Sequence, residues 1–243
     1  MSEPAFNPCV VIPVYKHAYI LTTFISKIGD YPIIIVDDGN PKSERELLNN
    51  LLGGRIFILT LLKNKGKGAA VVEGLKKAIE KGYTHALQID ADAQHDLSAI
   101  TLFFNEAEAN PEALINAYPV YDATAAAARK AGRKLTNFFV ELETAPNAIK
   151  DAMCGFRVYP LAQISKIIDR LYFKRMGFDI EIIVKAYRYR IDIINMPVKV
   201  VYPKGGYSNF RLILDNLKIS LLHAYLVTTM LLGAGRKDNA SSS

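Results

Sequence analysis

The chain of 243 residues has no tryptophan and only two cysteines, Cys9 and Cys154. Two cysteines fit neither the spacing of a zinc site nor a disulfide framework, which favours a reducing compartment. No basic leader precedes an apolar segment at the amino terminus, so a secretory signal is not expected. The longest apolar candidate, residues 221–235, contains His223 and falls short of the ~18 apolar residues of a membrane span. We therefore expect a cytoplasmic protein.

Acidic residues are in deficit, with 24 Asp and Glu against 30 Lys and Arg, so the formal net charge is +6. This balance favours an anionic partner, a class that includes nucleotides, lipid phosphates, membranes and nucleic acids. Aromatic and basic residues do not interleave as in nucleic-acid-binding motifs, so no nucleic-acid partner is expected. Half of the residues are hydrophobic, which predicts a folded chain with a sizeable core.

Short apolar runs alternate with helical patterns through the first half of the chain. This alternation predicts an α/β fold with a mostly parallel central sheet flanked by helices. The second half is less regular and combines predicted helices with shorter strands. Strands are predicted at 9–15, 32–38, 55–61, 84–90, 154–159, 191–195 and 198–202, and the later helices at 123–145, 160–170 and 178–190.

Polar residues that can carry chemistry follow three of the predicted strands. Asp37 and Asp38 follow the second strand, Lys65 and Lys67 the third, and the segment DADAQHD, residues 90–96, the fourth. Ligands of parallel α/β sheets bind beyond the carboxyl ends of the strands. We therefore expect these side chains to converge on one crevice.

Within the acidic segment, Asp90 and Asp92 are two residues apart. In an extended chain such residues project to the same side, roughly 6.5 to 7 Å apart. Two carboxylates, with the carbonyl oxygen of Gln94, suit a hard divalent cation. The alternative interpretation is a polar turn in which Asp96 caps a helix that starts at Leu97. The residues alone leave both interpretations open.

Two further motifs are weaker by themselves. Asp37 and Asp38, followed by Gly39, could form a turn or accept hydrogen bonds from a base or ribose. The segment NKGKGAAVVEGL, residues 64–75, places lysines and glycines where a helix begins, which attracts anions. It matches neither the Walker A pattern nor GxGxxG.

Taken in order, VVIPVY, IIIVDDGN, NKGKGAAVVEGLKKA, QIDADAQHD, DAMCGFRVYP and MGFDIEIIVKA resemble the motifs of family 2 glycosyltransferases. The chain is most similar to the branch of dolichyl- and polyprenyl-phosphate sugar synthases, over about residues 9–215. The resemblance implies a GT-A fold, a UDP- or GDP-linked sugar donor, inversion at the anomeric carbon, and Mg²⁺ or Mn²⁺ as cofactor. A lipid-linked or polyprenyl-phosphate acceptor is expected, although the GSRY-like segment common in this branch is replaced here, which leaves the acceptor open.

The resemblance also implies roles for individual residues. The nucleotide would contact Pro13, Tyr15, Asp37 and Asp38, with Lys67 nearby. The metal and the donor diphosphate would contact Asp90, Asp92 and Gln94, of which Asp92 is the expected principal metal ligand. The phosphates would be approached by Arg157, Lys204 and Arg211.

A hydroxyl acceptor would need a general base, whereas an ionised lipid phosphate needs little such help. The candidates are Asp151, Asp179 and Glu181. On a helix Asp179 and Glu181 would point ~200° apart, so they cannot both face one site. Cys154 is interpreted as a packing residue, and His95 as a residue that orients the metal loop.

A single GT-A domain is expected over residues 1–235, followed by a polar tail at 236–243. Within it we expect a nucleotide-binding half at about 8–120, an acceptor half at about 121–222 and an amphipathic carboxyl-terminal segment at about 208–235. This last segment mixes basic and apolar residues, which favours a peripheral helix at the cytoplasmic face of the inner membrane. A helix that closes the core, or a dimer contact, would explain the same apolar residues.

Two other functions compete with the glycosyltransferase. A nucleotidyltransferase acting on a sugar phosphate also uses an α/β sheet with paired aspartates, but it has a glycine-rich loop after the first strand, where this chain has IPVYKHAY. A non-catalytic nucleotide-binding module would have little use for DADAQ. The sequence therefore favours an inverting, metal-dependent glycosyltransferase.

Overall fold

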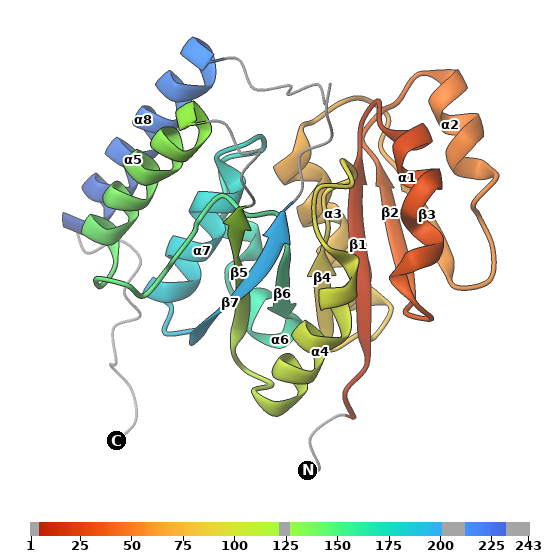
Figure 1. The fold of residues 1–243 in the computed structure, drawn as a ribbon, viewed down its shortest axis with the longest axis horizontal. Coiled ribbons are helices and arrows are strands. Elements are labelled where there is room, and N and C mark those ends of the chain that lie inside the picture. Colours follow the sequence, from red (N-terminus) through yellow and green to blue (C-terminus); the bar gives the residue numbers. More distant parts are fainter. Residues whose placement is uncertain (1–4, 122–126, 201–211, 232–243) are drawn as a thin grey trace.

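A computed structural model of the chain describes residues 5–121, 127–200 and 212–231. Its strands form one seven-stranded sheet in the order β3-β2-β1-β4-β6-β5-β7 (Figure 1). The strands are β1 (Pro8–Val14), β2 (Ile33–Asp37), β3 (Ile56–Thr60), β4 (His85–Gln88), β5 (Leu114–Tyr121), β6 (Arg157–Pro160) and β7 (Ile193–Val200).

The sheet is mostly parallel, as predicted. β1 pairs in parallel with β2 and β4, β2 with β3, and β5 with β7. Only β6 runs antiparallel to its neighbours, β4 and β5. The carboxyl ends of β1 to β4 therefore lie at one edge of the sheet, and β6 begins at that same edge.

One prediction about the strands was wrong: the runs at 191–195 and 198–202 belong to a single strand as far as Val200, although Pro197 lies between them. Proline lacks the N–H that a central strand needs for its second neighbour. β7 is the last strand of the sheet and has β5 as its only strand neighbour, which is the position where a sheet tolerates a proline.

Helices cover both faces of the sheet, and each face has its own apolar cluster. One cluster packs against α1, α2 and α4, and the other against α3, α6, α7 and α8.

The predicted helix at 160–170 is instead two short pieces, the helix α6 and a 3₁₀ turn. The helices are α1 (Ala18–Phe24), α2 (Lys42–Asn49), α3 (Lys67–Glu80), α4 (Ile100–Ala109), α5 (Ala127–Glu143), α6 (Leu161–Ile164), α7 (Phe178–Arg188) and α8 (Leu212–Leu231), with 3₁₀ turns at Ile25–Ile28, Leu97–Ala99 and Ile168–Arg170.

The carboxyl-terminal segment contributes α8, which lies beside α5 (Figure 1). Leu222 and Leu226 are wholly buried in the core cluster that α8 shares with α7. His223 forms a buried pair with Glu143 of α5, with 2.8 Å between Nδ1 and Oε1. This part of the segment therefore closes the core, which is one of the predicted alternatives.

In the described ranges we find no helix that combines the length and the apolarity needed to cross a membrane.

Gly74 lets helix α3 pack directly against the sheet. A Cβ at this position would overlap Val11 of β1 and lie 2.9 Å from Cγ2 of Val36 in β2. The close approach sets the height of α3 above the sheet. It thereby positions Lys67, the first residue of the helix, over the carboxyl ends of the strands.

We expect Gly74→Ala to destabilise the protein by about 1–3 kcal/mol because the methyl group overpacks the contact with Val11. Helix propensity alone predicts the opposite sign, a stabilisation of up to ~1 kcal/mol. Urea unfolding followed by circular dichroism measures the difference. A more stable variant would show that α3 does not depend on this contact.

Candidate active site

The acidic segment after β4 forms a turn and not the extended chain assumed from the sequence. Ala93 has a φ of 57°, and Oδ1 of Asp92 accepts a hydrogen bond of 3.1 Å from the backbone N–H of Gln94. The two carboxylates nevertheless lie near each other: burial, and then the charge of Asp90, raise the pKa of Asp92 to about 6. The turn therefore concentrates negative charge at the sheet edge.

The same segment also contains the predicted helix cap. Oδ1 of Asp96 accepts hydrogen bonds from the backbone N–H and the hydroxyl of Ser98, at 3.0 and 2.7 Å. Asp96 thus begins the 3₁₀ turn at Leu97–Ala99. The turn and the cap of the alternative interpretation are confirmed, and the metal interpretation of Asp90 and Asp92 stays a prediction.

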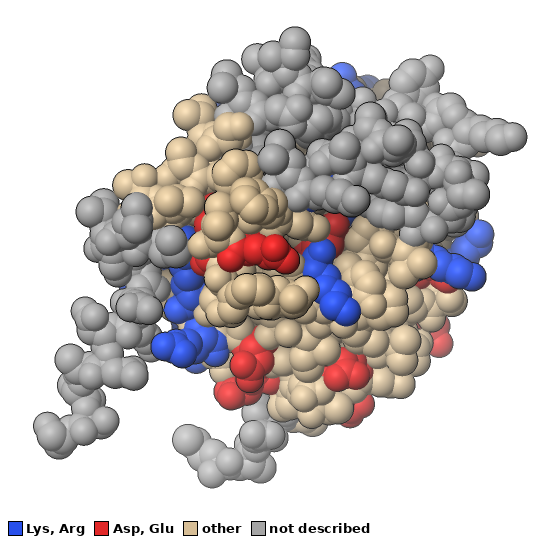
Figure 2. All heavy atoms as spheres, turned by 60° about the vertical axis from the view of Figure 1, so that its left-hand side comes forward, with Lys and Arg blue, Asp and Glu red and all other residues tan. Residues whose placement is uncertain are grey.

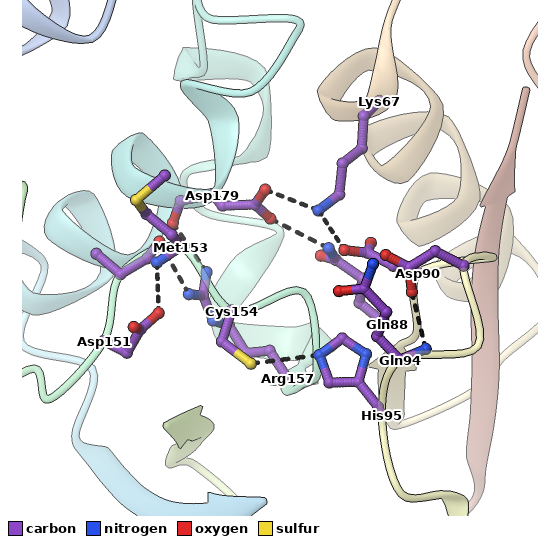
Figure 3. Close-up of polar contacts among 12 residues, drawn as sticks. Lys67, Gln88, Asp90, Gln94, His95, Asp151, Met153, Cys154, Arg157 and Asp179 are labelled. Atoms are coloured by element: carbon purple, nitrogen blue, oxygen red, sulfur yellow. Dashed lines mark hydrogen bonds and ion pairs between the residues drawn. The ribbon is translucent and has the colours of Figure 1, made fainter. Parts of the chain in front are cut away.

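Lys67 connects this turn to a distant part of the chain. Its ammonium group lies 2.8 Å from Oδ2 of Asp90 and 2.9 Å from Oδ2 of Asp179 (Figure 3). Burial alone would lower the pKa of Lys67, but the carboxylates of Asp179 and Asp90 outweigh it and raise the pKa above its ordinary value. The lysine therefore stays charged and joins the loop after β4 to the first turn of α7.

Gly155, in the segment before β6, leaves the space that the Asp90 side chain occupies. A Cβ on Gly155 would overlap Oδ2 of Asp90 and lie 2.6 Å from Oδ1. Oδ1 of Asp90 is buried and has no hydrogen-bond partner among the described residues. The glycine of the CGFR motif is thus explained by the close approach of a carboxylate.

The residues after β4 fit a divalent cation on two counts. The buried Oδ1 of Asp90 has no partner among the described residues, and the pKa of Asp92 is raised, first by burial and then by the charge of Asp90, so a cation would stabilise its ionised form. Among the residues described, no cluster of three or more His, Cys, Asp or Glu side chains could hold a metal. A cation here would bind the two carboxylates and complete its shell with other oxygens, as Mg²⁺ commonly does.

Asp37 and Asp38, both buried, organise the neighbouring loops. Oδ1 of Asp37 accepts hydrogen bonds from the backbone and side chain of Asn40, each at 2.8 Å. Asp38 accepts from the backbone N–H groups of Lys65 and Gly66, at 2.7 and 2.9 Å. The doublet therefore shapes the lysine-glycine loop that precedes α3.

Pro13 and Tyr15 lie on the same side of the site as the aspartate doublet. Pro13 is buried in β1, and Tyr15 follows the strand directly. The next residue, Lys16, has a φ of 59° and donates its backbone N–H to the side chain of Asn40 at 2.6 Å. Asn40 thus ties the loop after β1 to the loop after β2.

The three candidate bases lie in different surroundings. Asp179, at the first turn of α7, accepts hydrogen bonds from Lys67 and from Nε2 of Gln88, the latter at 3.1 Å. Asp151 is paired with Arg133 at 2.6 Å. Of the three, Asp179 alone contacts Lys67.

Glu181 points elsewhere on α7, as the helical spacing predicts. It is wholly buried, accepts hydrogen bonds from the backbone N–H groups of Tyr172 and Phe173, and pairs with Lys185. Its carboxylate fixes the chain segment before α7 and lies apart from Lys67.

Arg157 differs from its prediction. The guanidinium is wholly buried and donates to Oδ1 of Asn116 at 2.9 Å and to the backbone oxygen of Asp179 at 3.0 Å. In the antiparallel register of β4 and β6, Arg157 lies opposite Gln88. Its hydrogen bond to the backbone oxygen of Asp179 holds the first turn of α7 against the sheet. The two other predicted phosphate-binding residues, Lys204 and Arg211, lie outside the described residues.

Cys154 and His95 contact each other beside the site, with 3.5 Å between Sγ and Nε2. Burial raises the pKa of Cys154 to about 12, so the thiol stays protonated, in agreement with its interpretation as a packing residue. Burial likewise lowers the pKa of His95 to about 4, which keeps its ring neutral.

Sequence reasoning missed the buried polar residues beneath α7, namely Gln88, Asn116 and Tyr159. A glutamine within the apolar run THALQID was the available signal. An isolated polar residue in a strand is ambiguous until its partner is known, and the partners here come from distant parts of the chain.

Charged side chains of both signs alternate on the face that Figure 2 shows. Asp and Glu gather near the middle of the coloured surface, with Lys and Arg beside them. On the described part of this face, the net positive charge is therefore not concentrated in one basic stripe.

Known proteins resemble the chain in fold. Glucosyl-3-phosphoglycerate synthase from Mycobacterium tuberculosis, in complex with Mn²⁺, UDP-glucose and phosphoglyceric acid, superimposes with a TM-score of 0.63 and 14% identity, over 98% of this chain and 83% of that chain. TarS 1–349 from S. aureus, in complex with UDP-GlcNAc, gives 0.60 and 12%, over 91% and 66%. The predicted GT-A fold is confirmed.

Relatives in sequence include a dolichyl-phosphate β-glucosyltransferase from Dictyostelium discoideum, 28% identical over 69% of this chain. The chain spans about half, 54%, of the length of that relative. A UDP-N-acetylglucosamine–dolichyl-phosphate N-acetylglucosaminyltransferase from Methanococcus voltae is 21% identical over 86% of this chain and 92% of its own length. A polyprenol monophosphomannose synthase from Mycolicibacterium smegmatis is 21% identical over 85% and 82%.

The family model described as glycosyl transferase family 2 matches residues 9–167, which is more than half of the 243 residues. The motifs that carried the resemblance, from the first strand through CGFR, fall within this match. The chain therefore belongs to glycosyl transferase family 2.

Proposed function

We propose that the protein transfers a sugar, with inversion, from a UDP- or GDP-sugar to a polyprenyl phosphate or a similar lipid phosphate, with Mg²⁺ or Mn²⁺ as cofactor. The carrying observation is the convergence of Asp90, Asp92 and Asp179 around Lys67 at the carboxyl edge of the sheet. The relatives support the acceptor class, because their names specify dolichyl phosphate and polyprenol monophosphomannose. The family assignment removes support from the nucleotidyltransferase and from the non-catalytic module.

On the donor side, the loops after β1 and β2 would hold the nucleoside through Tyr15, Asp37 and Asp38. The diphosphate would lie over the turn after β4, with the cation held by Asp90, Asp92 and Gln94. When bound, the cation would stabilise the negative charge that develops on the departing diphosphate. Lys67 adds a positive charge beside Asp90.

On the acceptor side, Asp179 is the carboxylate that we expect to face the incoming group. A lipid phosphate is already ionised near neutral pH, so the step needs no strong base, and Asp179 would act by holding the Lys67 ammonium group at the site. A hydroxyl acceptor would instead give its proton to Asp179. In either case attack comes from the face of the sugar opposite the leaving diphosphate, which inverts the anomeric carbon.

We further propose that the chain is one domain in which residues of about 8–120 hold the donor and residues of about 121–222 face the acceptor. The burial of both cysteines as free thiols fits the expected cytoplasmic location. The face formed by α5 and α8 would rest on the membrane that contains the acceptor. Phe138 and Leu142 of α5 and Leu221 of α8 are large apolar side chains that are more than half exposed there.

We expect Asp92→Asn to lower turnover by ~10²–10³-fold, because a main ligand for the cation is lost. The measurement is transfer of labelled sugar from a panel of UDP- and GDP-sugars to polyprenyl phosphate, with Mg²⁺, with Mn²⁺ and with EDTA. Asp96→Asn is the matched control, since asparagine caps a helix as well as aspartate does. Full turnover in EDTA, or in Asp92→Asn, would refute the metal assignment.

Gly155→Ala should displace the Asp90 carboxylate and raise the metal concentration needed for half-maximal activity by ~10-fold or more. The reason is that the added methyl group occupies the space of Oδ2. Overpacking also costs stability, about 1–3 kcal/mol. Ala107→Val is the control because Ala107 is buried in α4, in the other apolar cluster, where overpacking costs comparable stability. An equal change of metal requirement in both variants would mean that stability alone is responsible.

The proposed membrane contact predicts that Leu142→Glu weakens binding to lipid vesicles by at least ~5-fold, because a buried leucine contributes about 1.5–3 kcal/mol. Co-flotation with vesicles, with and without an anionic lipid, measures the binding. Leu102→Glu on α4 is a matched control, since Leu102 is 55% exposed and Leu142 is 54% exposed. Equal losses in both variants, or no binding by the unmodified protein, would contradict the contact.

A further inference from the structure

We propose that Gln88 and Tyr159 are positioning residues that orient Asp179 for the transfer step. This inference rests on the proposed function and assigns to two buried residues a task within the same site. Neither residue contacts the solvent, so each would act only through Asp179.

The geometry places these residues under the start of α7. In the antiparallel register of β4 and β6, Gln88 lies opposite Arg157, and Tyr159 follows two residues later on the same face of the sheet. All three are wholly buried. The hydroxyl of Tyr159 is 2.8 Å from Oε1 of Gln88, and Nε2 of Gln88 is 3.1 Å from Oδ1 of Asp179.

The direction of these hydrogen bonds follows from the carboxylate. An ionised carboxylate only accepts hydrogen bonds, so the amide NH₂ of Gln88 must face Asp179 and its oxygen must face Tyr159. Tyr159 then has to donate. Burial raises the pKa of Tyr159 to about 12, so its hydroxyl keeps the proton that this donation requires. The amide of Gln88 therefore has one orientation.

Each oxygen of Asp179 has a donor of its own. Gln88 binds Oδ1, Lys67 binds Oδ2, and Arg157 binds the backbone oxygen of the same residue (Figure 3). Lys67 also binds Asp90 and would share its charge with the donor diphosphate. Gln88 and Tyr159 would keep Asp179 in place while the contacts of Lys67 change.

A purely structural explanation is that buried polar residues satisfy one another within the core. Polar groups without partners are costly there, but apolar residues could fill these strand positions without that cost. The cluster on this face contains apolar neighbours such as Ala86 and Phe178, and the buried polar residues Arg157 and Asn116 lie beside Gln88. The polar chain leads from Tyr159 to the carboxylate that faces Lys67, which favours a role at the site.

Steady-state kinetics of Gln88→Met and Tyr159→Phe test the inference. We expect kcat to fall by ~10–100-fold in Gln88→Met and by less in Tyr159→Phe, with the KM for the nucleotide sugar changed by less than ~3-fold, as for an interaction that matters mainly in the transition state. Tyr159→Phe removes a single oxygen atom, so it keeps the test valid if Gln88→Met does not fold. His85→Gln, a change of another buried polar residue of β4, is the control and should leave kcat unchanged.

A double-mutant cycle with Asp179→Asn separates positioning from a structural role. If Gln88 acts through Asp179, Gln88→Met should cause no further loss of kcat in the Asp179→Asn background. Additive losses, or unchanged kcat in Gln88→Met and Tyr159→Phe beside an active unmodified enzyme, would overturn the inference. If the unmodified enzyme transfers no sugar from any donor, the proposed function is overturned. The positioning role of Gln88 and Tyr159 in the transfer step is then overturned with it.

Discussion

The site depends on the ion pairs of one lysine with two carboxylates, Asp90 and Asp179. Asp90 follows β4 in the first half of the chain, and Asp179 lies in the first turn of α7 in the second half. Carboxylates of like charge repel each other, and the burial of Asp179 and partial burial of Asp90 limit the water that could weaken that repulsion. The ammonium group of Lys67 compensates both, so the two halves of the site are held together before any substrate binds.

The arrangement around this lysine requires close packing from several directions. Gly74 lets α3 approach the sheet, and Gly155 leaves room for the Asp90 carboxylate. Beneath α7, the buried guanidinium of Arg157 fixes the backbone at Asp179. The glycines and the arginine of the family motifs thus determine where the side chains of the proposed site lie. Much of the motif set therefore has a supporting role.

The excess of negative charge after β4 has a counterpart in the proposed chemistry. Asp92 has a raised pKa and Asp90 keeps one oxygen without a partner among the described residues, which are unfavourable features in a protein without its ligands. A divalent cation that arrives with the donor would relieve both. The proposed function would therefore account for local features that stability alone does not favour.

The alternation of apolar strands with helical patterns was enough to predict the parallel sheet, because hydrophobic periodicity and the βαβ connection are local properties of the chain. The ordered motifs likewise determined the family, and the strand ends predicted the edge at which Asp90 and Asp92 lie. The tertiary structure alone decided that Arg157 is buried, that Asp179 and not Glu181 contacts Lys67, and that Gln88 meets Tyr159. Each of these depends on side chains more than 20 residues apart, whose distances follow from sheet register and helix packing and leave no periodic pattern in the sequence.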